Sequence, residues 1–129
     1  MNQVRRKYPV LMFDKRRMQQ VLSNLLSNAI KFTRKGEIMV SGHVQQNVDD
    51  PSVLLLTVSV ADEGIGMSDE EIARVFDGRK VAKSSSLNPY SNGIGLPFCK
   101  KICQIFDGNI SVISVLGQGS QFTFTMCVK

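Results

Sequence analysis

The sequence lacks any apolar run long enough to cross a lipid bilayer. The longest run, residues 53–61, is interrupted by Thr57 and Ser59 and falls far short of the ~20 apolar residues that a transmembrane helix needs. The chain also does not open on a charged segment followed by an apolar stretch and a cleavage site, which is the pattern of a secretory leader. We therefore expect this segment to be cytoplasmic.

Cysteine and histidine are scarce, which argues against a metal centre built from them. The three cysteines are Cys99, Cys103 and Cys127, and no histidine lies near them at metal-ligand spacing. We interpret them as small apolar residues in a reduced compartment. The one histidine, His43, lies in the middle of a predicted strand, and we interpret it as a structural or surface residue.

The overall balance of residue types is that of one folded domain. At 129 residues, with 43% hydrophobic and 21% charged residues, the chain can bury a core of its own. Its net charge of +5 raises the question of nucleic acid. The densest basic groups, residues 5–7 and 15–17, lack a companion pattern of exposed aromatics, so we expect no nucleic-acid partner.

The hydrophobic pattern predicts strands and helices in mixed order within a single domain, residues 1–129. A helix is predicted over 14–32, with Asp14 as N-cap and Gly36 as a stop. Two further helices are predicted over 68–76 and 96–106, and strands over 10–13, 37–45, 53–61, 109–116 and 120–128. The polar segment 77–92 is unusually long for a loop, which favours a functional or mobile role. This order predicts an α+β fold with helices on one face of a mixed sheet.

The first predicted helix has two faces of different character. Its apolar face recurs at three- and four-residue steps and consists of Met18, Val21, Leu22, Leu25, Leu26, Ala29 and Ile30. The opposite face carries a single stripe of Gln20, Asn24, Asn28 and Lys31. Neutral amide oxygens beside a lysine suit a magnesium–phosphate pair. The alternative is a polar outer face that happens to use asparagine.

Two glycine-rich segments have patterns that can bind nucleotides, and each is weak evidence alone. Asp62-Glu63-Gly64-Ile65-Gly66 follows a buried strand, where glycines allow a tight turn and an Asp can accept a hydrogen bond from an exocyclic amine. Asn92-Gly93-Ile94-Gly95-Leu96-Pro97 precedes the last helix, where backbone N–H groups bind phosphate. Phe98 stands where a dinucleotide fingerprint has its third glycine, and no Gly-Lys-Ser/Thr follows either segment. An ordinary turn and a Gly-rich helix entry are the respective alternatives.

The amide stripe, the first glycine-rich segment, the long polar loop and the second glycine-rich segment follow one another along the chain. Taken in that order, they closely resemble the ATPase domain of sensor histidine kinases, within the GHKL superfamily. Residues 20–32 look like that family's N box, and residues 62–66 look like its first glycine box. Residues 75–76 resemble the start of its F box. Residues 93–96 resemble its second glycine box, and residues 117–122 resemble its final glycine turn. The resemblance covers nearly the whole chain. It implies the Bergerat ATP-binding fold, a two-layer α/β sandwich with a mixed, mostly antiparallel sheet and about three helices on one face. Residues 77–92 would be the ATP lid.

The resemblance also implies a role for each matching residue. Asn28 would ligate Mg²⁺, Asn24 and Lys31 would contact the phosphates of ATP, and Asp62 would receive the adenine amine. Gln20 would orient the acceptor. The other residues implied to bind the nucleotide are Gly64, Ile65, Gly66, Gly93, Ile94, Gly95, Leu96 and Ser120.

Asn24 separates this chain from related hydrolases. Gyrase, mismatch-repair and heat-shock-90-type ATPases have a Glu at that position to activate water, whereas an amide cannot take a proton at neutral pH. The resemblance therefore implies phosphoryl transfer to a better nucleophile, an imidazole. Since His43 is not on a helix, the acceptor would belong to a separate dimerisation domain N-terminal to this one. A receiver domain would act downstream of this transfer. The isolated domain is expected to be a monomer. The full-length protein would suit a membrane-bound sensor of which this domain is a cytosolic part.

Four positions depart from the family's pattern. Ser91 stands where the second glycine box usually begins with Gly, Arg79 where a second aromatic is common, and Gln121 where Thr is common. Pro97 removes one backbone N–H that could face phosphate. These departures keep open a degenerate module that binds nucleotide or a partner without catalysis; a gyrase-type hydrolase is disfavoured by Asn24. The sequence does not decide which lid cation contacts the γ-phosphate among Arg79, Lys80 and Lys83.

Overall fold

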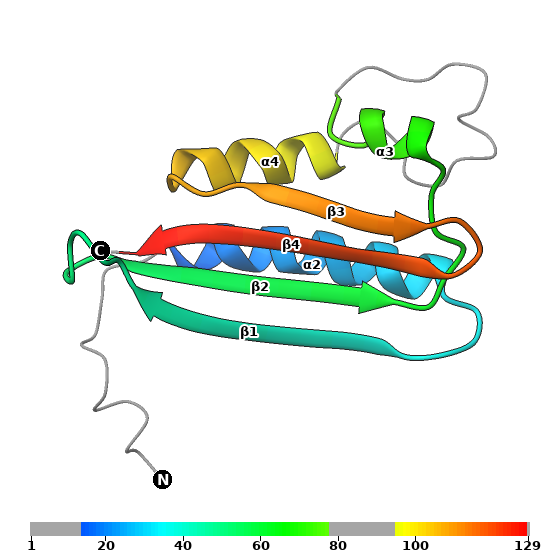
Figure 1. Ribbon diagram of the computed structural model, residues 1–129, viewed down its shortest axis with the longest axis horizontal. Helices are drawn as coiled ribbons and strands as arrows, with labels where there is room; N and C mark the ends of the chain where they lie inside the picture. The colour runs from blue at the N-terminus through cyan, green and yellow to red at the C-terminus, as the bar shows by residue number, and fades with distance from the viewer. Residues whose placement is uncertain (1–13, 78–94, 129) are drawn as a thin grey trace, which may run out of the picture.

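A computed structural model describes residues 14–77 and 95–128 (Figure 1). Its helices are α2 (Lys15–Phe32), α3 (Asp69–Arg74) and α4 (Gly95–Ile105), and its strands are β1 (Ile38–Gln46), β2 (Leu54–Asp62), β3 (Ile110–Val115) and β4 (Gly119–Val128). Each of these was predicted to within a few residues. The predicted strand at 10–13, residues 78–92 of the predicted lid, and Gly93 and Ile94 lie outside the described residues.

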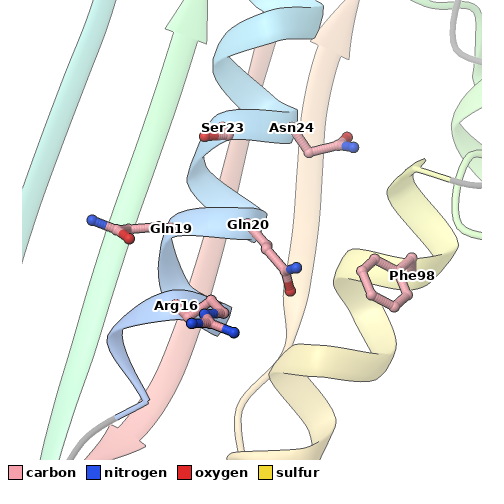
Figure 2. A pocket seen from close by; sticks show the side chains of 6 residues that line it. All are labelled: Arg16, Gln19, Gln20, Ser23, Asn24 and Phe98. Atoms are coloured by element: carbon pink, nitrogen blue, oxygen red, sulfur yellow. The ribbon is translucent and has the colours of Figure 1, made fainter.

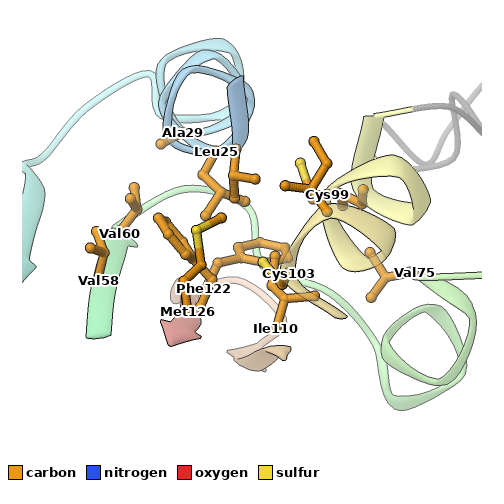
Figure 3. Packing of buried hydrophobic residues seen from close by; sticks show 14 of the residues in the cluster. Leu25, Ala29, Val58, Val60, Val75, Cys99, Cys103, Ile110, Phe122 and Met126 are labelled. Carbon is orange, nitrogen blue, oxygen red and sulfur yellow. The ribbon is translucent and has the colours of Figure 1, made fainter. Parts of the chain in front are cut away.

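The strands form one sheet in the order β1-β2-β4-β3, and all three neighbouring pairs are antiparallel. Helices α2 and α4 pack against each other and against the same face of this sheet, which makes a second layer (Figures 1 and 3). The α+β class and the mostly antiparallel sheet are therefore confirmed. No parallel pair occurs among the described strands. None of the described helices has the length and apolar content needed to span a membrane.

Local signals explain where the helices begin. The Asp14 side chain accepts a hydrogen bond from the backbone N of Arg17 at 3.2 Å, as an N-cap should. Ser68 and Glu71 form a reciprocal capping box at the start of α3. Helix α2 is amphipathic, and it buries the residues that point at the sheet: Val21, Leu25, Ala29 and Phe32. Ile30, which was predicted on the same apolar face, is 66% exposed.

The core lies between the helix layer and the sheet (Figure 3). Strand β4 contributes alternate residues, Phe122, Phe124 and Met126, each at most 3% exposed. Cys99 and Cys103 of α4 are buried against them. Burial raises the pKa of the Cys99 thiol to about 12 and that of Cys103 to about 11, so both are neutral at physiological pH. This agrees with their interpretation as small apolar core residues.

The sheet register sets up one end of the molecule for binding. Strand β2 ends at Asp62, which lies opposite Ser120 of β4. The chain then turns through residues 63–67, and this turn lies against the hairpin between β3 and β4. A hydrogen bond from Gly117 N to Ile65 O, at 2.7 Å, joins the two. The first glycine-rich segment is thus held at the end of two central strands.

Candidate nucleotide site

Two members of the amide stripe lie on the side of α2 that faces α4. Gln20 and Asn24 both project toward α4, which carries Phe98 on its first turns (Figure 2). Asn24 and Asn28 are half-buried, whereas Gln20 and Lys31 are exposed. Gln20 Oε1 accepts a hydrogen bond from Arg17 Nη1 at 2.9 Å, and Lys31 Nζ lies 5.3 Å from the centroid of the Phe32 ring.

Asn24 is in direct contact with the second glycine-rich segment. A Cβ placed on Gly95 would lie 2.7 Å from Asn24 Nδ2 and 2.8 Å from its Oδ1, so any larger residue at 95 would displace this amide. The Asn24 Oδ1 atom is buried and has no hydrogen-bond partner among the described residues. A buried, unsatisfied carbonyl oxygen is costly, which points to a ligand, an ion or water that completes it.

A pocket of about 490 Å³ opens beside Asn24, between α2 and α4 (Figure 2). It is lined by Arg16, Gln19, Gln20, Ser23, Asn24 and Phe98. The wall on the α2 side is polar, and the Phe98 ring on the α4 side is 44% exposed. Asn24 therefore stands between this opening and Gly95.

Asp62 is the one acidic residue that the structure buries, within the part of the chain that it describes, and it is only 8% exposed. Its Oδ1 accepts a hydrogen bond from Gly64 N at 2.9 Å. Burial raises the pKa of Asp62 above its ordinary value of 3.8, while hydrogen bonds from the backbone of Gly64 and Ser120 oppose that shift. Such a carboxylate is fixed in place and poorly solvated, and it keeps acceptor capacity for an amine of a flat ligand.

The glycines beside Asp62 are required by close backbone contacts. Gly66 has φ +67, and a Cβ there would collide with the Val115 carbonyl oxygen of the β3–β4 hairpin. A Cβ on Gly64 would collide with the carbonyl oxygen of Phe32 at the end of α2. Only glycine lets this turn lie so near both neighbours.

A protein family described as "Histidine kinase-, DNA gyrase B-, and HSP90-like ATPase" matches residues 13–129. The chain belongs to this ATPase family.

Several sensor kinases of the family are similar in sequence. The chain is 44% identical to the sensor histidine kinase RcsC of Escherichia coli K12 over 111 residues, which are 85% of this chain and 11% of RcsC. It is 36% identical to GacS of Pseudomonas protegens over 90% of this chain and 12% of GacS. It is 38% identical to the adaptive-response sensory kinase SasA of Parasynechococcus marenigrum over 92% of this chain and 30% of SasA. The chain thus spans a small part of each relative.

A solved structure, full-length ShkA in complex with AMPPNP, matches 92% of this chain and 23% of its own length, with a TM-score of 0.70 and 27% identity. Together these comparisons confirm an ATP-binding catalytic domain of the sensor histidine kinase type. The binding roles of single residues in this ATPase domain remain predictions.

One contributor to the site was missed by sequence analysis. Ser114 of β3 accepts a hydrogen bond from Met67 N at 2.8 Å, donates to Gly119 O at 2.9 Å and lies 2.8 Å from the Ser120 hydroxyl. It thereby connects the end of the first glycine box to the hairpin of the ATPase domain. The available signal was a serine on the inward-facing side of a strand whose other inward residues, Ile110 and Val112, are apolar.

The raised pKa of Asp62 predicts a pH-dependent stability. Because the folded state binds this proton more tightly than the unfolded chain, the stability that Asp62 contributes is fully present below pH 3.8 and is lost as the pH rises through the raised pKa. Relative to an Asp62→Asn variant, the wild-type free energy of unfolding should therefore fall across that window. Urea unfolding of both proteins at a series of pH values measures this effect. If the free energy of unfolding of the wild type instead rose with pH relative to that of the variant, the backbone hydrogen bonds to Asp62 would outweigh its burial.

Proposed function

We propose that this domain binds Mg²⁺–ATP and transfers the γ-phosphoryl group to a histidine on a separate helical dimerisation domain, from which a receiver domain takes it in two-component signalling. The observation that carries the proposal is the Asn24 amide. Its buried oxygen has no partner in the described part of the chain, it touches Gly95 at the start of α4, and it stands where hydrolytic relatives place a water-activating Glu.

The residues present fit the nucleotide and its metal. The stripe supplies neutral amide oxygens and one cation, and Mg²⁺ prefers hard oxygen ligands in small number. Asn28 would hold Mg²⁺ through its amide oxygen, Asn24 and Lys31 would contact the phosphates, and the Asp62 carboxylate would accept the adenine amine. When bound, Mg²⁺ neutralises the charge of the phosphate oxygens.

In the transfer step, an imidazole nitrogen of the acceptor forms a bond to the γ-phosphorus. The bond from that phosphorus to the β–γ bridging oxygen breaks, and ADP leaves with the electron pair. Asn24 and Lys31 would hold the γ-phosphoryl in line with the acceptor, and positioning of this kind accounts for most of the catalysis in phosphoryl transfer. Gln20, at the pocket beside Asn24, would orient the acceptor.

The position of His43 supports an acceptor on another domain. His43 lies in the middle of β1, paired with Thr57 of β2, and it is exposed. It is thus carried by a strand of the rigid sheet, whereas the amide stripe is on α2. His43 and Asn24 thus belong to different elements of the fold, β1 and α2.

We expect phosphotransfer to appear only when the chain is mixed with Mg²⁺–ATP and a histidine-bearing dimerisation domain. The product should be phosphate on the acceptor that is labile in acid and stable in base. An Asn28→Asp variant should lose this signal, because it places an added negative charge beside the triphosphate, which repels it. Gln104→Glu, the same change of chemistry on the exposed side of α4, should retain it.

Two results would contradict the proposal in different ways. Binding of ATP by titration calorimetry without transfer to any acceptor would identify a nucleotide-binding pseudokinase. Release of inorganic phosphate at several turnovers per second without an acceptor would instead identify a hydrolase of the gyrase type.

A further inference from the structure

A second pocket, of about 440 Å³, is lined by residues from the end of α2, from the segment that leads into β1 and from the turn of the β3–β4 hairpin. These segments lie at the same end of the sheet (Figure 1). Phe32, Ile65 and Leu116 give it an apolar floor, and Arg34 and Lys35 are on its rim. None of Gln20, Asn24, Asn28 or Asp62 lines it. Gly64 and Ile65 of the first glycine box do line it. The pocket therefore adjoins that segment, and it is not lined by the amide stripe or by Asp62.

The apolar side chains of this pocket are unusually open to solvent. Leu116 is 62% exposed and Ile65 is 44% exposed, although they come from segments that are tightly held. Gly117 N donates to Ile65 O at 2.7 Å, which fixes the two apolar residues side by side. An exposed apolar surface of fixed shape with a polar rim is typical of a protein interaction site.

The pocket is lined by two cationic side chains, Arg34 and Lys35, and by one carboxylate. The one carboxylate in the pocket, Glu63, is turned to its own chain, where Oε2 accepts a hydrogen bond from Glu37 N at 3.3 Å. Its side chain also packs on Gly36, since a Cβ there would lie 2.7 Å from that oxygen. Arg34 and Lys35 are both exposed and are left to face an incoming partner.

We propose that this pocket, which we call the hairpin pocket, is a docking site for an acidic segment of a partner protein that inserts an aliphatic or aromatic side chain between Ile65 and Leu116. The carboxylates of such a segment would complement Arg34 and Lys35. A small molecule is disfavoured because walls this exposed cannot enclose most of its surface. A lipid surface is disfavoured because the site is hollow, and an anchor side chain in a pocket is how protein interfaces concentrate affinity.

The test uses the whole 129-residue chain, labelled with ¹⁵N, and two amphipathic peptides. One peptide carries leucine and phenylalanine on one face with flanking glutamates; the other has lysine in place of each glutamate. The acidic peptide should shift the amide signals of Ile65, Leu116 and Gly117. Its affinity should fall about tenfold in Leu116→Asp and in the double variant Arg34→Glu, Lys35→Glu, as expected for loss of an anchor or of the complementary charge.

Two matched controls separate this site from general effects of charge and of surface polarity. Ile105→Asp changes another exposed aliphatic residue, 75% exposed at the end of α4, and Lys101→Glu reverses an exposed charge on the same helix. Neither should alter binding of the acidic peptide by more than about twofold. The amide spectrum of each variant reports whether it is folded, and the double charge variant leaves the apolar floor intact.

Equal binding of the two peptides, shifts centred elsewhere, or no binding would overturn the proposal. Binding to vesicles of phosphatidylcholine and phosphatidylglycerol without binding to the acidic peptide would overturn it in favour of a membrane surface. Adding Mg²⁺–ATP to the same sample tests the nucleotide site independently. A chain that binds the peptide and not ATP would refute the proposed function and leave the docking site standing.

Discussion

Replacing Asp62 with asparagine is expected to weaken ATP binding by roughly 100-fold, which corresponds to about 2.7 kcal/mol. The buried carboxylate accepts from Gly64 N and would accept the adenine amine with its remaining capacity. An amide has one acceptor oxygen and two N–H donors, so it cannot serve both donors without turning its NH₂ group toward one of them. The ligand would lose a hydrogen bond to a charged acceptor and meet a misplaced donor.

Calorimetric titration with Mg²⁺–ATP measures this effect. Asp49→Asn is the matched control, because it makes the same isosteric change at an exposed position in the β1–β2 turn, at the other end of the sheet from the first glycine box (Figure 1). It should bind ATP like the wild type. An Asp62→Asn variant that is folded and binds ATP within a few-fold of wild type would remove Asp62 from the site.

A Gly66→Ala variant is expected to lose about 3 kcal/mol of unfolding free energy and most of its affinity for ATP. Positive φ alone costs a non-glycine residue about 1–2 kcal/mol. The added methyl group must also push the Val115 carbonyl away, which is overpacking worth a further 1–3 kcal/mol. That displacement would strain the neighbouring bond from Gly117 N to Ile65 O and disturb the turn that follows Asp62.

Gly117→Ala provides a close control for the backbone strain. Gly117 also has positive φ, at +84, yet nothing lies within 4 Å of a Cβ added there. This variant should lose about 1 kcal/mol and keep ATP affinity. Equal losses in the two variants, measured by urea unfolding, would mean that the contact with Val115 contributes nothing beyond the strained φ.

The helices and strands could be predicted from the sequence because their signals are local. Helix α2 carries its N-cap and its apolar period within its own sequence, and the Ser68–Glu71 box marks the start of α3 directly. The helix ends at Phe32, as predicted, but it is capped at Thr33, so Gly36, which was predicted as its stop, lies too late in the chain. The order of strands could not be predicted, because alternation shows which face of a strand is buried and not which strand lies beside it. The position of β4 between β2 and β3 depends on long-range packing.

The features of the candidate site likewise fall into those that a local sequence pattern predicts and those that depend on tertiary packing. The stripe of amides followed from helical spacing alone, and the structure places Gln20 and Asn24 on one side of α2 (Figure 2). The contact of Asn24 with Gly95 required the packing of α2 on α4, and the bonds of Ser114 to Met67 and Gly119 required the sheet. Tertiary contacts of this kind have no local pattern. The metal and phosphate roles of Asn28 and Lys31 remain predictions.

The strand order has a consequence for synthesis of the protein. Strand β4 comes last of the described elements along the chain, yet it occupies an interior place in the sheet, between β2 and β3. A nascent chain emerging from the ribosome therefore exposes an unpaired edge of β2 until residues 119–128 are released. Neither Asp62 nor Gly66 can reach its final surroundings before then, so the capacity to bind nucleotide should arise in one step, with the closing strand.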